Sequence, residues 1–94
     1  MSDNNLEVRE MLQIIIKEEF PLEKEIYYEQ LKLKNFKKIQ EIVHKIKHKI
    51  NAVGLVEGYA LANNYENNLR NESLELSKEF EEILNEITNF IKTF

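Results

Sequence analysis

The chain has no cysteine and no tryptophan, and its 94 residues include only one proline and two glycines. Without cysteine it can form no disulfide, use no thiolate nucleophile and build no zinc site with cysteine ligands. The glycines, Gly54 and Gly58, fit neither a phosphate-binding loop nor a dinucleotide-binding fingerprint. An all-β fold would need many more turn residues. An all-helical protein is therefore expected.

Long hydrophobic runs are also missing. The longest purely aliphatic run is Ile14, Ile15 and Ile16, whereas a membrane-spanning helix needs about 20 apolar residues. No charged segment followed by an apolar one marks a secretory leader. Hydrophobic residues make up 43% of the chain and charged residues 32%, which suits one packed core with a solvated surface. We expect a single domain over residues 1–94, cytoplasmic and monomeric, without a membrane partner.

Charge is distributed unevenly along the sequence. The net charge is −4, yet residues 32–49 hold seven lysines against one glutamate. This basic block predicts a docking face for an anionic partner, for which the candidate residues are Lys37, Lys45 and Lys49. A solvated helix face rich in lysine is the alternative. Nucleic acid is not expected as a partner, because the only arginines, Arg9 and Arg70, lie outside the block.

Apolar residues recur with helical spacing along almost the whole sequence. The first stripe consists of Val8, Met11, Leu12, Ile15 and Ile16. The pattern is interrupted at Pro21 and then resumes through Leu22, Ile26, Tyr27, Leu31 and Leu33. Because proline tends to kink or end a helix, this region predicts either two helices or one helix bent at Pro21, reaching to about Lys34.

Three further amphipathic helices are predicted after this region. Asn35 is a suitable N-cap for the second, which should end near Gly54. The stripe of the second helix consists of Phe36, Ile39, Val43, Ile46 and Ile50. That of the third consists of Leu55, Gly58, Tyr59, Ala62, Tyr65 and Leu69. That of the fourth consists of Leu76, Phe80, Ile83, Ile87, Phe90 and Phe94. Four amphipathic helices with short connections predict an all-α, antiparallel up-and-down four-helix bundle.

The two histidines lie on the lysine-rich helix, outside its apolar stripe. At about 100° per residue, His44 falls roughly 120° from the centre of the stripe and His48 nearly opposite it. Neither is expected in the core. Their i, i+4 spacing suits zinc, but a zinc site needs further ligands. Lys45, Lys47 and Lys49 interleave the pair, and neighbouring cations oppose a divalent ion. The sequence therefore argues against a metal or other cofactor.

An exposed imidazole can also act as a nucleophile on phosphorus. Such a ring needs positive charge near the transferred oxygens and a partner that orients its other nitrogen. Lys47, at i+3 from His44, is placed to neutralise a phosphoryl group. Gln40 and Glu41, one turn before His44, are candidates for orienting the ring. A plain surface histidine is the alternative.

The run His44-Lys45-Ile46-Lys47 followed by Val53-Gly54-Leu55 resembles the active helix of histidine-containing phosphotransfer (HPt) domains. That family has the motif His-x-x-Lys-Gly, with a second Gly ten residues after the His and an apolar residue next. The resemblance is greatest to HPt domains of anaerobic-response hybrid sensor kinases, which also carry a proline upstream, as at Pro21. It covers roughly residues 20–66. His48 replaces the family's first Gly and adds bulk beside the site.

The resemblance implies a phosphorelay intermediate in two-component signalling. His44 would accept a phosphoryl group from the aspartyl phosphate of a receiver domain and pass it to another receiver. Lys47 would neutralise the phosphate, with Gln40, Glu41 and His48 in support, and the receiver would supply Mg²⁺ and most catalytic groups. The implied partners are response-regulator receiver domains and a hybrid histidine kinase. The protein itself would not be an enzyme.

The sequence also allows two other interpretations. The chain could be a helical adaptor that binds a receiver or kinase domain without accepting phosphate. It could also be a self-associating bundle, because the 4-3 spacing of the last stripe is that of a coiled-coil seam. Four helices can bury that stripe internally, so the sequence favours this last reading least.

Overall fold

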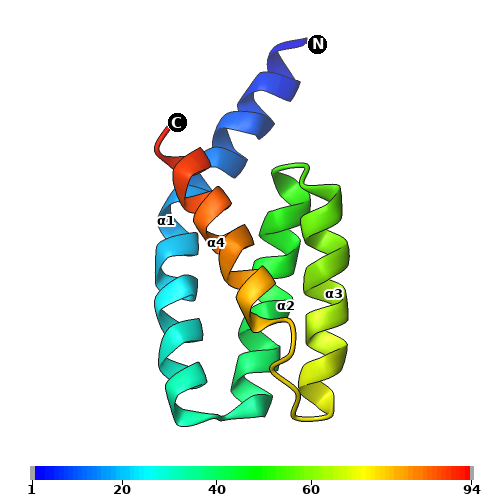
Figure 1. Ribbon diagram of the computed structural model, residues 1–94. Helices are drawn as coiled ribbons and strands as arrows, with labels where there is room; N and C mark the ends of the chain where they lie inside the picture. The colour runs from blue at the N-terminus through cyan, green and yellow to red at the C-terminus, as the bar shows by residue number, and fades with distance from the viewer. Residues whose placement is uncertain (1, 94) are drawn as a thin grey trace.

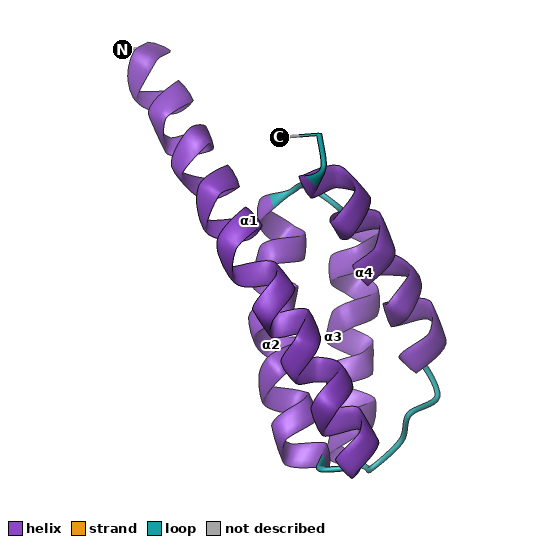
Figure 2. Ribbon diagram, turned by 90° about the vertical axis from the view of Figure 1, so that its left-hand side faces the viewer, coloured by secondary structure: helices purple, strands orange, loops and turns teal. Residues whose placement is uncertain are grey.

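The computed structural model describes residues 2–93, with side chains from residue 10 onward. It contains four helices, α1 (Ser2–Leu33), α2 (Phe36–Ala52), α3 (Val56–Arg70) and α4 (Ser77–Ile91), which form a helical bundle (Figure 1). Helices and the loops between them account for this whole range (Figure 2). The all-helical prediction is confirmed. No described helix is both long enough and apolar enough to cross a lipid bilayer.

The first helix runs through Pro21 without a break. Proline removes one backbone donor and crowds the preceding turn, so it bends a helix that tertiary packing keeps intact. Figure 1 shows α1 changing direction along its length, with its N-terminal turns leaning away beyond the other helices. Of the two arrangements predicted around Pro21, the structure has a single helix.

The core is built from residues of all four helices. Its buried apolar members are Ile16, Phe20, Tyr27, Ile39, Ile42, Val43, Ile46, Ile50, Ala62, Tyr65, Leu69, Phe80, Ile83, Leu84 and Ile87. The stripes predicted for α2, α3 and α4 supply most of this set, although Phe90 is 45% exposed. Phe94 lies outside the described residues.

The stripe predicted at the start of α1 is mostly wrong. Ile16 is buried, but Met11, Leu12 and Ile15 are 40–61% exposed. The physical reason is that α1 extends past the end of the bundle here, where no other helix can cover its apolar face (Figure 1). Further along, Leu22, Ile26 and Leu33 are exposed as well. The side chain of Val8 lies outside the described residues.

Three helices end in the same hydrogen-bonded motif. At the end of α2, Gly54 has φ = +81°, its N–H bonds to Asn51 O and the N–H of Leu55 bonds to Ile50 O. This is a Schellman cap, which satisfies carbonyls that the helix leaves unpaired. It confirms Gly54 as the stop signal. The N-cap prediction is also confirmed, since the Asn35 side chain accepts from Lys38 N.

Polar contacts join α1 to both of its neighbours α2 and α3. The hydroxyls of Tyr27 on α1 and Tyr65 on α3 are 2.7 Å apart in the core. At the surface, Lys49 Nζ lies 3.0 Å from Glu19 and 3.1 Å from Glu23, both on α1. The Lys49 ion pairs hold α2 beside α1 and so help to set the direction of its outer face, which carries both histidines.

Candidate functional site

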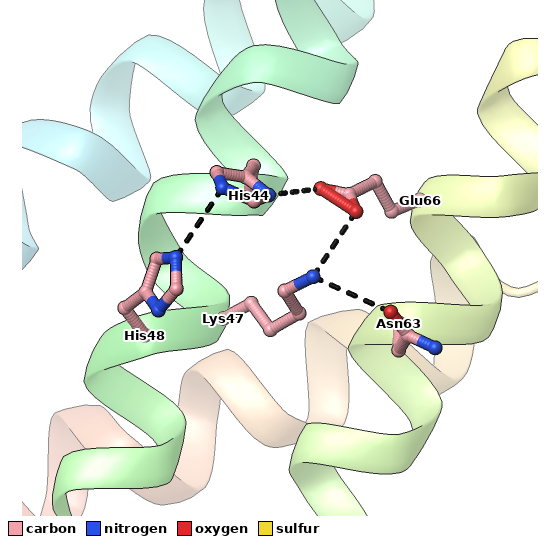
Figure 3. Close-up of polar contacts among 5 residues, drawn as sticks. All are labelled: His44, Lys47, His48, Asn63 and Glu66. Atoms are coloured by element: carbon pink, nitrogen blue, oxygen red, sulfur yellow. Dashed lines mark hydrogen bonds and ion pairs between the residues drawn. The ribbon is translucent and has the colours of Figure 1, made fainter.

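His44 lies on the outer face of α2, at the edge that faces α3. Its side chain is 55% exposed, and its Nδ1 is 2.6 Å from Glu66 Oε1 on α3 (Figure 3). One nitrogen of the ring is therefore held by the bundle. The prediction that His44 stands outside the core is confirmed.

Glu66 is a buried carboxylate with two cationic or protonated neighbours. Only 6% of its side chain is exposed, and its second oxygen lies 3.1 Å from Lys47 Nζ. Burial alone would raise the pKa of Glu66, but the hydrogen bonds and charges of Lys47 and His44 outweigh that effect and lower the pKa below its ordinary value. Glu66 is consequently ionised at neutral pH.

This ionisation fixes the tautomer of the neutral His44 ring. An ionised carboxylate can only accept hydrogen bonds, so the proton in the 2.6 Å contact belongs to His44 Nδ1. The other nitrogen, Nε2, then carries a lone pair and no proton. The site thus presents a nucleophilic nitrogen on the exposed edge of α2.

His48 lies one turn further along α2, next to that nitrogen. Its Nε2 is 3.3 Å from His44 Nε2, and the two rings are nearly perpendicular, with an interplanar angle of 87°. Because His44 Nε2 has no proton in this tautomer, the hydrogen bond requires a proton on His48 Nε2. Figure 3 shows His44 between two partners, Glu66 on one side and His48 on the other.

The structure places Lys47 differently from the sequence expectation. Its side chain is only 8% exposed, and its ammonium donates to Glu66 Oε2 and, at 3.3 Å, to Asn63 Oδ1. Lys47 and His44 therefore share one carboxylate. The charge of Lys47 stabilises ionised Glu66 and so acts on the His44 ring through it.

The other predicted supporting residues lie near His44 without holding it. Gln40 is half-buried and Glu41 is exposed. Among the described residues, the hydrogen bond to His44 Nδ1 is made by Glu66, and neither Gln40 nor Glu41 bonds to the ring. Glu66, which is 22 positions from His44 in the sequence, orients the ring, the role that was expected of Gln40 or Glu41.

The predicted docking lysines divide into two groups. Lys37 and Lys45 are exposed and border an open depression beside His44. Lys49 is only 14% exposed at its side chain, because it is bound to Glu19 and Glu23 of α1. The depression is lined by Lys37, Gln40, Glu41, His44, Lys45, Glu66 and Arg70.

Sequence reasoning missed three residues of this site: Glu66, Asn63 and Arg70. All three belong to α3, and they reach the site because α3 packs against α2. Glu66 follows Tyr65 at the edge of the apolar stripe of α3. A carboxylate at the edge of an apolar stripe, on a helix expected to lie next to the histidine helix, could have indicated Glu66 as a partner of His44. Asn63 and Arg70 carry no comparable signal.

The described residues contain no group of three or more His, Cys, Asp or Glu side chains that could hold a metal ion. No protein-family model matches the sequence, and neither a curated protein nor a solved structure matches it. The geometry of the site and the motif from His44 to Leu55 are therefore the features that indicate a function.

Proposed function

We propose that the protein is a phosphorelay intermediate that carries a phosphoryl group on His44. The proposal depends on one observation: His44 Nδ1 bonds at 2.6 Å to the buried carboxylate of Glu66, while the His44 side chain is 55% exposed. The ring is thus oriented by the bundle and open to a second protein. The partners would be response-regulator receiver domains and a hybrid histidine kinase.

The transfer itself needs little from this chain. His44 Nε2 attacks the phosphorus of an aspartyl phosphate, the N–P bond forms, and the P–O bond to the aspartate breaks with its electron pair leaving on the carboxylate. No proton has to be removed first, because in the tautomer that Glu66 imposes Nε2 carries a lone pair. His48, which donates to that lone pair in the structure, must turn away before the attack. Glu66 also favours the positive charge that the ring acquires. The receiver would provide Mg²⁺ and the remaining catalytic groups.

The charges around His44 support a receiver as the partner. Receiver active sites are clusters of acidic residues. Around the depression beside His44, the exposed Lys37, Lys45 and Arg70 outnumber the one exposed acid, Glu41. Such a basic rim accelerates association with an acidic cleft. We assign docking to these three residues and, as the motif implies, neutralisation of the phosphate to Lys47. For that role its ammonium would have to turn from Glu66 towards a bound phosphoryl group.

The fold proposed for this function is an antiparallel, HPt-like bundle. The links α1–α2 and α3–α4 lie together at one end of the molecule in Figure 1 and the α2–α3 link lies at the other, which supports that arrangement. The match of His44, Lys47, Gly54 and Leu55 to the HPt motif supports it from the sequence.

The test is transfer from a phosphorylated receiver. The protein should acquire a label that is acid-labile and stable in base, and His44→Gln should abolish it. His48→Gln is the matched control, because it removes the other histidine and should still accept label. Label that survives in His44→Gln and vanishes in His48→Gln would place the phosphoryl group on His48 and contradict the proposal. Tight receiver binding without any label would instead favour a non-phosphorylated adaptor.

A further inference from the structure

The two histidine nitrogens that face each other are spaced like the donors of a chelate. His44 Nε2 and His48 Nε2 are 3.3 Å apart, and both rings are on the exposed side of α2 (Figure 3). Two imidazole nitrogens bound to zinc at 2.0–2.1 Å and at the tetrahedral angle lie about 3.3 Å from each other. At the right angle of a square-planar site they would lie only about 2.9 Å apart. The observed spacing matches the tetrahedral value, and a small rotation of the two rings out of their hydrogen bond would point both lone pairs at one ion.

The second coordination shell is also present. A metal-bound histidine normally donates its other ring N–H to a carboxylate, which orients the ring and makes the coordinating nitrogen a better donor. His44 Nδ1 has such a partner in Glu66, 2.6 Å away and buried. His48 becomes a second donor when its proton moves from Nε2 to Nδ1, a change of tautomer that leaves the ring neutral.

The charges near the pair oppose a cation less than the sequence indicates. Of the three lysines that interleave the histidines, Lys47 is paired with Glu66, and Lys49 is paired with Glu19 and Glu23. Lys45 is the third and is exposed, so solvent screens its charge. The electrostatic objection to a divalent ion therefore weakens once the tertiary contacts are known.

We propose that His44 and His48 form a two-nitrogen chelate for a tetrahedral divalent ion of the zinc type, with water in the remaining positions. The ion would use the lone pair of His44 Nε2, which is the nitrogen assigned to phosphoryl transfer. Metal binding and phosphorylation would then exclude each other. The exclusion rests on the proposed function, whereas the chelate does not.

The chelate is tested by titrating the untagged protein with Zn²⁺ by calorimetry, while NMR follows the ring nitrogens of its only two histidines. Both Nε2 signals should shift together at one equivalent. His44→Gln and His48→Gln should each bind at least about tenfold more weakly, because either change removes the chelate. Equal affinity in wild type and both variants would assign the zinc to carboxylates elsewhere and overturn the proposal.

A matched variant separates chelation from the mere number of histidines. His48→Gln combined with Asn51→His keeps two histidines on α2 but places them seven residues apart, about two turns or 10 Å along the helix. Asn51 is exposed, so the helix should tolerate the change. This double variant should bind zinc as weakly as His48→Gln. Wild-type affinity in it would contradict a chelate between His44 and His48.

The exclusion is tested by phosphotransfer with and without Zn²⁺, comparing each protein with its own zinc-free rate. Zinc should slow labelling of the wild type and have much less effect on His48→Gln, which keeps His44 but not the chelate. Equal slowing of both would place the effect on the receiver and contradict the exclusion. If the wild type takes no label even without zinc, the proposed function fails, while the calorimetric result still decides the chelate.

Discussion

The carboxylate of Glu66 on α3 accepts a hydrogen bond from His44 Nδ1 on α2 at 2.6 Å. The contact joins two helices and leaves Nε2 on the exposed side of α2, where His48 Nε2 lies 3.3 Å away. A buried acid thus sets the tautomer of an exposed base. The chemistry proposed for His44 depends on this one contact more than on any neighbour along its own helix.

Replacing Glu66 by glutamine should weaken both the site and the fold. The amide no longer fixes the His44 tautomer, and it leaves the nearly buried ammonium of Lys47 without its charged partner. We expect a loss of about 1.5–3 kcal/mol in the free energy of unfolding and a phosphotransfer rate lower by about tenfold or more. Denaturant unfolding and receiver-dependent labelling measure the two effects.

Glu41→Gln is the matched control for this substitution. Glu41 borders the same depression but is exposed and does not bond to the ring. Its stability should change by no more than about 0.5 kcal/mol. If Glu66→Gln were equally mild in both stability and transfer rate, the carboxylate would have no special role.

Acid should destabilise the protein partly through Glu66. Its pKa is lowered in the folded state by Lys47 and His44, against the effect of burial, from an ordinary value of 4.5. The unfolded chain therefore binds a proton at this carboxyl more readily than the folded one. The resulting stability is fully present above pH 4.5 and is lost as the pH falls through the lower folded value.

Urea unfolding at a series of pH values from 7 to about 3 tests this effect. Glu66→Gln should lose less stability than wild type over the acidic part of the series, because it has no carboxyl to protonate there. The other acidic residues titrate in both proteins, so the comparison isolates Glu66. Parallel stability curves for the two proteins would refute the assignment.

The hydroxyls of Tyr27 and Tyr65 should be energetically coupled. They are 2.7 Å apart in the core, and burial raises the pKa of both phenols, which keeps them protonated. Tyr27→Phe or Tyr65→Phe alone leaves one buried hydroxyl without its partner, at a cost of about 1–3 kcal/mol. The double variant should cost less than the two single changes together, by about 1 kcal/mol. Additive losses in a thermal or denaturant double-mutant cycle would argue against the bond.

Two helix caps can be improved by glycine. Lys34 and Glu72 have φ values of +52° and +58°, each at the position of a Schellman cap that Gly54 occupies after α2. A residue with a side chain is strained there, so Lys34→Gly and Glu72→Gly should each stabilise the protein by about 0.5–1 kcal/mol. Gly54→Ala, where a Cβ would meet nothing within 4 Å, should destabilise it by a similar amount through backbone strain alone. Calorimetric melting measures all three, and destabilised glycine variants would contradict the expectation.

The sequence alone was sufficient to predict the local features of this protein. Helical periodicity located the cores of α2, α3 and α4, Asn35 and Gly54 marked the ends of α2, and the position of His44 relative to the apolar stripe predicted its exposure. Each of these depends on residues within a few turns of one another, where the geometry of a helix relates spacing directly to direction.

Tertiary structure alone decided which partners meet across helices. It brought Glu66 to His44 over a separation of 22 residues, paired Lys49 with α1 instead of leaving it on a docking face, and left the apolar start of α1 uncovered. One amphipathic pattern fits several lateral arrangements of helices, because periodicity specifies which face is buried but not which neighbour buries it.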